Sequence, residues 1–181
     1  MMKNNKLKDL VNIIKSNIYD ELTIESITVD NKEIYNKLIY IYCKFEKYEK
    51  GLQLYEKYKT IFKQEEGTIY CMTQIYCLLN YVDKALELLL LYDININIRH
   101  YYYILQYYSN NDTNKLIMTY LITKSQGLKL REDEIELFVK PTLKHEFLYI
   151  MYNIKEYCYS FSFDLFNKIK DTFGTEIEFI N

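Results

Sequence analysis

The chain has 181 residues, of which 49% are hydrophobic, so it can bury the core of one ordinary domain. Its formal charge is −2 and its pI is about 5.8, so it lacks the basic excess with which most nucleic-acid binders neutralise phosphates. The segment Met1–Lys6 shows no signal peptide, and no apolar run approaches the roughly 20 residues that span a bilayer. We therefore expect a soluble intracellular protein, most simply cytoplasmic, with no membrane contact.

The helical elements begin with an amphipathic pattern over 6–18, followed by a polar connector over 19–30 in which Asp30 or Asn31 can cap the next helix. Three helix pairs follow. In the second and third pairs the turn after the first helix contains Asn80 and Asn110-Asn111-Asp112, respectively, and Asn and Asp tolerate turn conformations. Gly127 is placed to end the third pair. The expected pairs are 32–45 with 48–62, 67–79 with 82–91, and 99–109 with 113–125.

A fourth pair is fainter. It covers 132–140 and 143–159, with Pro141 between them to end or kink the first helix. A last helix is expected over 162–173, before Gly174. The tail 175–181 alternates weakly and could be a short extended segment.

Related residues recur at a fixed spacing of 34 positions. The pairs are Tyr42 and Tyr76, Cys43 and Cys77, and Leu52 and Leu86. A period of this size is typical of a helix-turn-helix unit that stacks on copies of itself. We predict an all-α fold, a right-handed α-solenoid of stacked antiparallel helix pairs in a single domain 1–181. Residues 1–30 would cap it, 31–140 would form three to four repeats, and 141–181 would supply C-terminal capping helices.

Residue chemistry argues against catalysis. The four cysteines form no C-x-x-C pair, and with only His100 and His145 they lack the spacing of a zinc site. We interpret them as small core residues in a reducing compartment. No Gly-rich phosphate loop, His-Glu-x-x-His or Gly-x-Ser-x-Gly motif is present. We expect no enzyme, no cofactor, no metal and no small-molecule substrate.

The repeated stretch resembles the pentatricopeptide repeat, whose first helix runs Tyr-Asn-x-Leu-Ile-x-x-Tyr-Cys-Lys and whose second contains Ala-Leu-x-Leu-Phe. The matching residues are Tyr35-Asn36-Lys37-Leu38-Ile39, Tyr42-Cys43-Lys44 and Gly51-Leu52-Gln53-Leu54-Tyr55. Residues 69–89 repeat this pattern. Neither the Trp of tetratricopeptide repeats nor the Thr-Pro-Leu-His turn of ankyrin repeats is present. The segment Gly127–Leu130 is similar to the family's Gly-x-x-Pro ending, with Leu130 replacing the Pro.

Residues 99–172 are similar, more weakly, to the repeat module on the N-terminal side of protein-only RNase P. The similarity rests on Arg99-His100-Tyr101, the turn 110–114, Gly127, the segment 132–138 and Ser162–Phe166. In that family a zinc-bridged region and a metal-dependent nuclease domain follow the repeats. This sequence contains neither, so the resemblance implies an RNA-holding module without the cutting module.

The resemblance also implies base-reading positions, one after the first-helix Tyr and one at the repeat's end. These are Asn36 with Glu65, then Tyr70 with Ile96, then Tyr101 or Tyr102 with Leu130 or Arg131. Only Asn36 is a usual reader. The positions that would sandwich a base hold Glu33, Gly67 and, in one register, Ile98, and only Ile98 fits. A one-base-per-repeat code is therefore not expected, whereas recognition of RNA shape stays open.

Two functions remain. The first is a non-catalytic module that binds RNA, in particular structured RNA such as tRNA, during RNA processing. Its candidate contacts are Lys32, Asn36, Lys37, Glu65, Tyr70, Arg99, His100, Tyr101, Tyr102 and Arg131. The second is a protein–protein adaptor that holds a peptide or helix on its concave face. The motif favours RNA, while the low pI and the missing base readers favour the adaptor.

Overall fold

A computed structural model describes residues 2–92, 96–154 and 161–174. Every regular element in these ranges is helical, and the prediction of an all-α fold is confirmed. The chain falls into two compact units, 1–100 and 101–181, and α7 (Ile98–Asn111) runs across their boundary. The expected division into a cap, repeats and a second cap stays a prediction.

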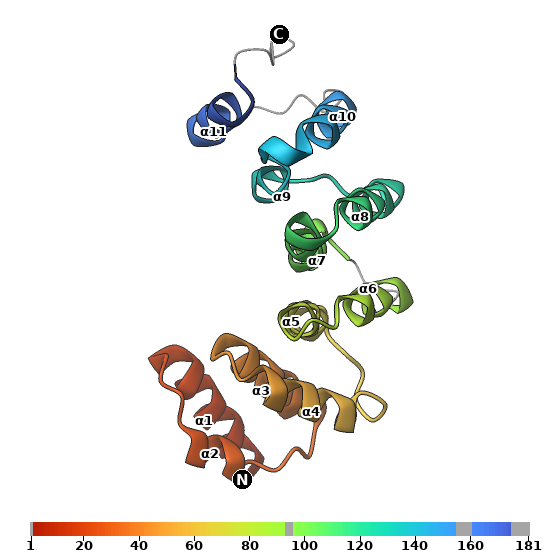
Figure 1. Ribbon diagram of the computed structural model, residues 1–181. Coiled ribbons are helices and arrows are strands. Elements are labelled where there is room, and N and C mark those ends of the chain that lie inside the picture. The colour runs from red at the N-terminus through yellow and green to blue at the C-terminus, as the bar shows by residue number, and fades with distance from the viewer. Residues whose placement is uncertain (1, 93–95, 155–160, 175–181) are drawn as a thin grey trace. The chain divides into compact units, whose positions relative to one another are not determined.

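The first unit contains α1 (Met2–Ser16), α2 (Glu21–Ser26), α3 (Lys32–Lys44), α4 (Tyr48–Tyr58), α5 (Glu66–Leu78) and α6 (Val82–Leu91). Helices α3 and α4 form one pair and α5 and α6 the next, with α3 against α5 and α4 against α5 (Figure 1). Helix α1 packs on α3 and buries Leu10 and Ile13 against Leu38 and Ile41.

The connector expected over 19–30 contains a helix, which corrects that expectation. Asp20 begins α2 because its side chain accepts a hydrogen bond from Thr23 N at 3.1 Å. Ile24 of α2 is buried against the same core as α1. The sequence of 19–30 resembles a polar connector because a helix of six residues buries only one or two side chains, here Ile24.

The second unit contains α8 (Thr113–Ser125), α9 (Glu132–Glu136), α10 (Lys144–Ile154) and α11 (Phe163–Phe173), with a 3₁₀ turn η1 (Pro141–Leu143) before α10. The ring of Tyr120 on α8 meets Phe138 after α9 and Tyr149 on α10, with centroids 6.3 and 6.4 Å apart. Phe147 of α10 stacks on Phe173 of α11 at 4.8 Å.

The first helix of the fourth expected pair is shorter than the predicted range 132–140. Helix α9 ends at Glu136, and Pro141 begins the 3₁₀ turn, where its missing N–H is not needed. The expected continuation to 159, Cys158 and the tail 175–181 lie outside the described residues. Cys43, Cys71 and Cys77 are free and buried, in agreement with their interpretation as core residues.

Caps and turns explain where the helices begin and end. The side chains of Asn31, Asp112 and Ser162 each accept a backbone N–H of the first turn that follows. Asn80 has φ 63° and Gly127 has φ 72°, so both adopt the left-handed turn conformation predicted for them. Helix α7 runs on to Asn111, past the expected stop at 109.

A buried ladder fixes the repeat register. The same place in four successive first helices holds a side chain that is 0% exposed: Tyr35, Ile69, Tyr101 and Ile135. The residues just before them are buried as well: Ile34, Thr68, His100 and Glu134. These positions are 34, 32 and 34 residues apart. The middle step is two residues shorter than the other two, and in this alignment of buried positions Tyr101 corresponds to Tyr35 and Ile69.

Candidate nucleic-acid interface

The ladder gives the residues at the position that the pentatricopeptide resemblance would assign to a base reader, one after each buried side chain. They are Asn36, Tyr70, Tyr102 and Glu136. In the third repeat the position therefore belongs to Tyr102, because Tyr101 is inside the core. Three residues earlier stand exposed Glu33, Gly67, Arg99 and Asp133. Ile98, which suited a base sandwich in the other register, is buried.

A cavity of about 990 Å³ in the first unit gathers four of the sequence-predicted contacts. Lys32, Asn36 and Lys37 reach it from α3, and Glu65 lies just before α5. Apolar walls come from Leu7 and Ile14 of α1 and from Ile34 and Tyr40 of α3. The cavity thus combines a polar side with an apolar one, as sites for planar organic groups commonly do.

Lys32 and Glu65 meet at the rim of this cavity. Lys32 Nζ lies 3.0 Å from Glu65 Oε1, and both side chains are about half exposed. Glu65 therefore neutralises one of the two lysines. No hydrogen bond or ion pair involves Lys37 Nζ among the described residues, so its charge is available to a ligand.

Asn36 lies deeper than expected. It is 8% exposed, and its Oδ1 accepts a hydrogen bond of 2.7 Å from Thr68 Oγ1 on α5. Its Nδ2 is buried without a partner among the described residues. A buried donor without a partner is costly, so native structures rarely keep one without a reason.

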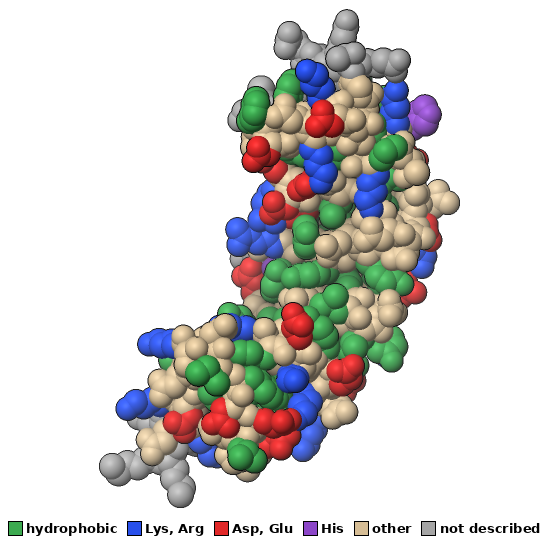
Figure 2. Space-filling model, turned by 60° about the vertical axis from the view of Figure 1, so that its left-hand side comes forward, with side chains coloured by type: hydrophobic (Ala, Val, Ile, Leu, Met, Phe, Trp, Pro, Cys, Tyr) green, Lys and Arg blue, Asp and Glu red, His purple; other side chains and the backbone are tan. Residues whose placement is uncertain are grey.

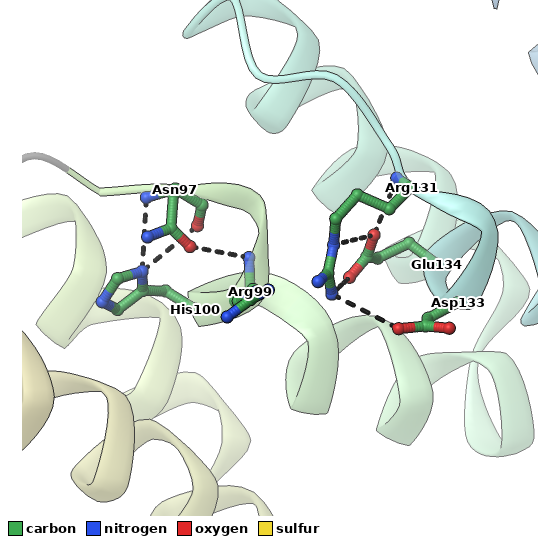
Figure 3. Close-up of polar contacts among 6 residues, drawn as sticks. All are labelled: Asn97, Arg99, His100, Arg131, Asp133 and Glu134. Carbon is green, nitrogen blue, oxygen red and sulfur yellow. Dashed lines mark hydrogen bonds and ion pairs between the residues drawn. The ribbon is translucent and has the colours of Figure 1, made fainter. Parts of the chain in front are cut away.

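His100 corrects the expectation of a solvated helix start, because it is only 2% exposed. Its Nδ1 lies 3.2 Å from both the N and the O of Asn97, and the ring meets Tyr70 edge-on with centroids 6.0 Å apart (Figure 3). Arg99 beside it is exposed, and its backbone N donates to Asn97 Oδ1 at 3.0 Å. In this cluster Arg99 faces solvent and His100 does not.

Tyr101 is equally withdrawn. Its hydroxyl donates to Gln126 Oε1 at 3.0 Å, and burial raises the pKa of Tyr101 above its ordinary value. Tyr35 makes the matching bond to Gln64 Oε1 at 2.9 Å in the first unit. Both tyrosines tie a first helix to the segment after its partner helix. Tyr101 is therefore a packing residue, whereas Tyr102 is half-buried and lines a cavity.

Arg131 is engaged by two carboxylates, Glu134 and Asp133 (Figure 3). Its Nη2 lies 2.5 Å from Glu134 Oε1, and its backbone N donates to Glu134 Oε2 at 2.7 Å. The Glu134 side chain is 0% exposed. Arg131 thus serves as the counter-ion of a buried acid. The sequence places it among the candidate RNA contacts at helix starts.

A second cavity of about 340 Å³ lies in the unit 101–181 beside Tyr102. Lys140 Nζ donates there to Ser109 O at 2.8 Å and to Asn110 Oδ1 at 2.7 Å, at the end of α7. Burial, and then the charge of Lys168, hold the pKa of Lys140 below its usual value. Lys168 is itself paired with Glu136. Sequence reasoning missed both lysines, which come together only through the packing of α7, α9 and α11.

Charges of both signs alternate on the face that Figure 2 shows. On the face drawn in Figure 2, Lys and Arg lie among Asp and Glu in each unit, and neither sign forms a continuous area. Among the described residues, no three or more His, Cys, Asp or Glu side chains gather as metal ligands would. None of the described helices is long and apolar enough to cross a membrane.

No protein-family model matches the sequence, and no curated protein matches it. Among solved structures, nuclear proteinaceous RNase P 2 from A. thaliana is similar, with a TM-score of 0.75 and 16% sequence identity. The superposition covers 96% of this chain and 42% of that one, so the chain spans less than half of that protein's length. This likeness confirms the fold as a helical-repeat array.

Proposed function

We propose that this chain is a non-catalytic, pentatricopeptide-like module that binds RNA, in particular structured RNA such as tRNA, and acts in RNA processing. The observation that carries the proposal is the cavity between α1, α3 and α5. It places Lys37, with no described partner, next to Asn36, whose buried Nδ2 has none either. The similarity in fold to a proteinaceous RNase P supports RNA as the class of ligand.

The chain supplies three kinds of contact that RNA uses. Lys37 and the exposed Arg99 offer positive charge to phosphates. Tyr40 and Tyr102 offer partly exposed rings on which unpaired bases can stack. Asn36 offers a hydrogen bond to a base edge. His100, Tyr101 and Arg131 are left out of the proposed contacts because two are buried and the third is held by carboxylates.

Filter binding to tRNA and to an unstructured RNA of equal length, at 50 and 200 mM salt, tests the proposal. We expect tighter binding of tRNA, with affinity falling steeply as salt rises because bound phosphates release counterions. Lys37→Ala and Arg99→Ala should each weaken binding and reduce the slope of log K against log salt by about one. Lys63→Ala, which removes an exposed lysine outside the cavity, is the matched control. No binding at low salt would refute the proposal.

A protein adaptor is the second candidate, and one observation favours it. Helices α8 and α10, which lie side by side, expose apolar side chains: Met118, Leu121, Leu148, Tyr149 and Tyr152. Exposed apolar groups of this kind commonly mark protein contacts. An adaptor would bind neither RNA at 50 mM salt, so the same filter assay separates the two functions.

A further inference from the structure

Helices α8 and α10 each carry exposed apolar side chains on one side. On α8 these are Met118 and Leu121, which are three positions apart. On α10 they are Leu148, Tyr149 and Tyr152, at spacings of one and three. Residues three or four positions apart lie on the same side of a helix. These five residues are named the α8–α10 face.

Two contacts join the two sides into a single surface. The ring of Tyr149 meets that of Tyr120 with centroids 6.4 Å apart. One turn further along, Lys124 Nζ donates to Asn153 Oδ1. Both contacts link residues 29 positions apart, so α8 and α10 run in the same direction. Lys124 lies one turn after Leu121, and the exposed apolar side of α8 therefore adjoins that of α10.

The charged side chains of these two helices are mostly positive. Helix α8 carries Lys115 and Lys124, both exposed, and no acid. Helix α10 carries Lys144, His145 and one acid, Glu146. Lys115 and Lys124 lie before and after the apolar side chains of α8, and Lys144 precedes those of α10. Lysines thus flank the α8–α10 face, although the whole chain has a charge of −2.

This chemistry distinguishes between the possible occupants of the face. A second copy of the chain, related by a two-fold axis, would bring the same lysines together, and like charges at an interface are unfavourable. RNA phosphates would meet the lysines, but Met118, Leu121 and Leu148 offer a base neither a hydrogen bond nor a ring. A protein helix with an apolar stripe and acidic residues beside it suits both parts, because it covers the apolar groups while its carboxylates approach the lysines.

We infer that the α8–α10 face is a docking site for an acidic amphipathic helix of a partner protein. The apolar stripe of that helix lies over the five residues of the face, and its carboxylates lie beside Lys115, Lys124 and Lys144. None of these residues is among the proposed RNA contacts. The inference therefore goes beyond RNA binding and does not rest on it, and it gives the adaptor candidate a partner of stated chemistry.

Fluorescence anisotropy with three labelled peptides of about 18 residues, long enough to form a helix, tests the inference. The first peptide has Leu at alternating spacings of three and four and Glu or Ala elsewhere. The second replaces every Glu with Lys, and the third has the composition of the first in an order without a stripe. We expect the first to bind with a Kd of about 10 μM, as suits a small interface, and the other two to bind at least about tenfold more weakly.

Two pairs of variants locate the binding on the face. Tyr152→Ala should weaken binding of the acidic peptide about tenfold, whereas Leu91→Ala on α6, where the residue is equally exposed at 73%, should leave it unchanged. Lys124→Glu should weaken binding of the acidic peptide and strengthen that of the Lys peptide. Lys63→Glu, an exposed position of the first unit, should change neither by more than about twofold. All four side chains are exposed, so the variants should fold, which circular dichroism checks.

The outcomes separate this inference from the proposed function. Equal binding of the three peptides, or an affinity unchanged by Tyr152→Ala, overturns the docking site. A dimer in analytical ultracentrifugation that Tyr152→Ala abolishes would assign the face to a second copy, and a loss of tRNA affinity in Tyr152→Ala would assign it to RNA. A protein that binds tRNA but not the acidic peptide refutes the inference alone. One that binds the acidic peptide but not tRNA refutes RNA binding alone.

Discussion

Removing the Arg131 side chain should destabilise the second unit without weakening RNA binding. The Glu134 carboxylate accepts bonds from Arg131 N at 2.7 Å, Nε at 3.2 Å and Nη2 at 2.5 Å. Arg131→Ala keeps the backbone bond and deletes the other two. The carboxylate, which is 0% exposed, then stays buried with one partner in place of three.

The magnitude follows from the burial of the two groups. Breaking a fully buried ion pair by removing one partner costs about 3–5 kcal/mol. The Arg131 side chain is 38% exposed, so water can reach part of the site, and we expect about 2 kcal/mol. For a unit of this size each 1 kcal/mol lowers Tm by about 4–8 °C, so the loss corresponds to about 8–16 °C.

Scanning calorimetry and tRNA binding on the same samples check this prediction. Arg99→Ala is the comparison, because Arg99 is an exposed helix-start arginine whose guanidinium makes no bond or ion pair with other described residues. It should change Tm by at most about 2 °C while weakening tRNA binding, the reverse of Arg131→Ala. The double variant Arg131→Ala with Glu134→Gln should recover part of the lost stability, since no buried charge remains. Equal effects of Arg99→Ala and Arg131→Ala on Tm would refute this reasoning.

Two further predictions concern stability. Gly51→Ala should destabilise the first unit by about 1 kcal/mol, because the new Cβ would lie 2.8 Å from Ile75 Cδ1 and 3.3 Å from Tyr42 Cβ. Adding Ile75→Val removes that Cδ1, so in urea titrations the double variant should lose less stability than the sum of the two single variants, and independent, additive losses would contradict the close approach. Burial raises the pKa of the Cys77 thiol to about 12. Between about pH 9 and 12 the unfolded chain has therefore lost a proton that the folded chain still holds, so the free energy of unfolding should fall as pH rises. The urea midpoint measured from pH 8 to 10 should therefore decline, and less steeply in Cys77→Ala; equal slopes would show that Cys77 does not contribute.

Much of the scaffold could be read from the sequence because it depends on local patterns. The 34-residue spacing of Tyr42 and Tyr76 predicted the stacked pairs α3–α4 and α5–α6, and the ends of these helices agree with the expected ranges to within a few residues. Caps such as Asn31 and turns such as Asn80 act through bonds within a few residues of chain, so their residue types are informative by themselves. Helix α2 was missed because so short a helix leaves almost no periodic signal.

The candidate site was only partly predictable, because its properties depend on contacts between repeats. The sequence identified Lys32, Asn36, Lys37 and Glu65, which the first-unit cavity brings together. It gave no sign of Thr68, whose bond to Asn36 spans 32 residues. It also could not distinguish Tyr101 from Tyr102, since only the packing of the helices shows which of two adjacent tyrosines is buried.

The sequence by itself thus determined the helices, their pairing and the repeat period, since these follow from hydrophobic spacing and turn chemistry along the chain. Only the tertiary structure decided which polar side chains remain available. His100 and Tyr101 are buried and Arg131 is held by Glu134, whereas Lys37 and the Nδ2 of Asn36 have no partner in the described chain. The reason is physical: whether a donor is free depends on what the neighbouring repeat places within about 3 Å of it, and that distance is set by packing between helices.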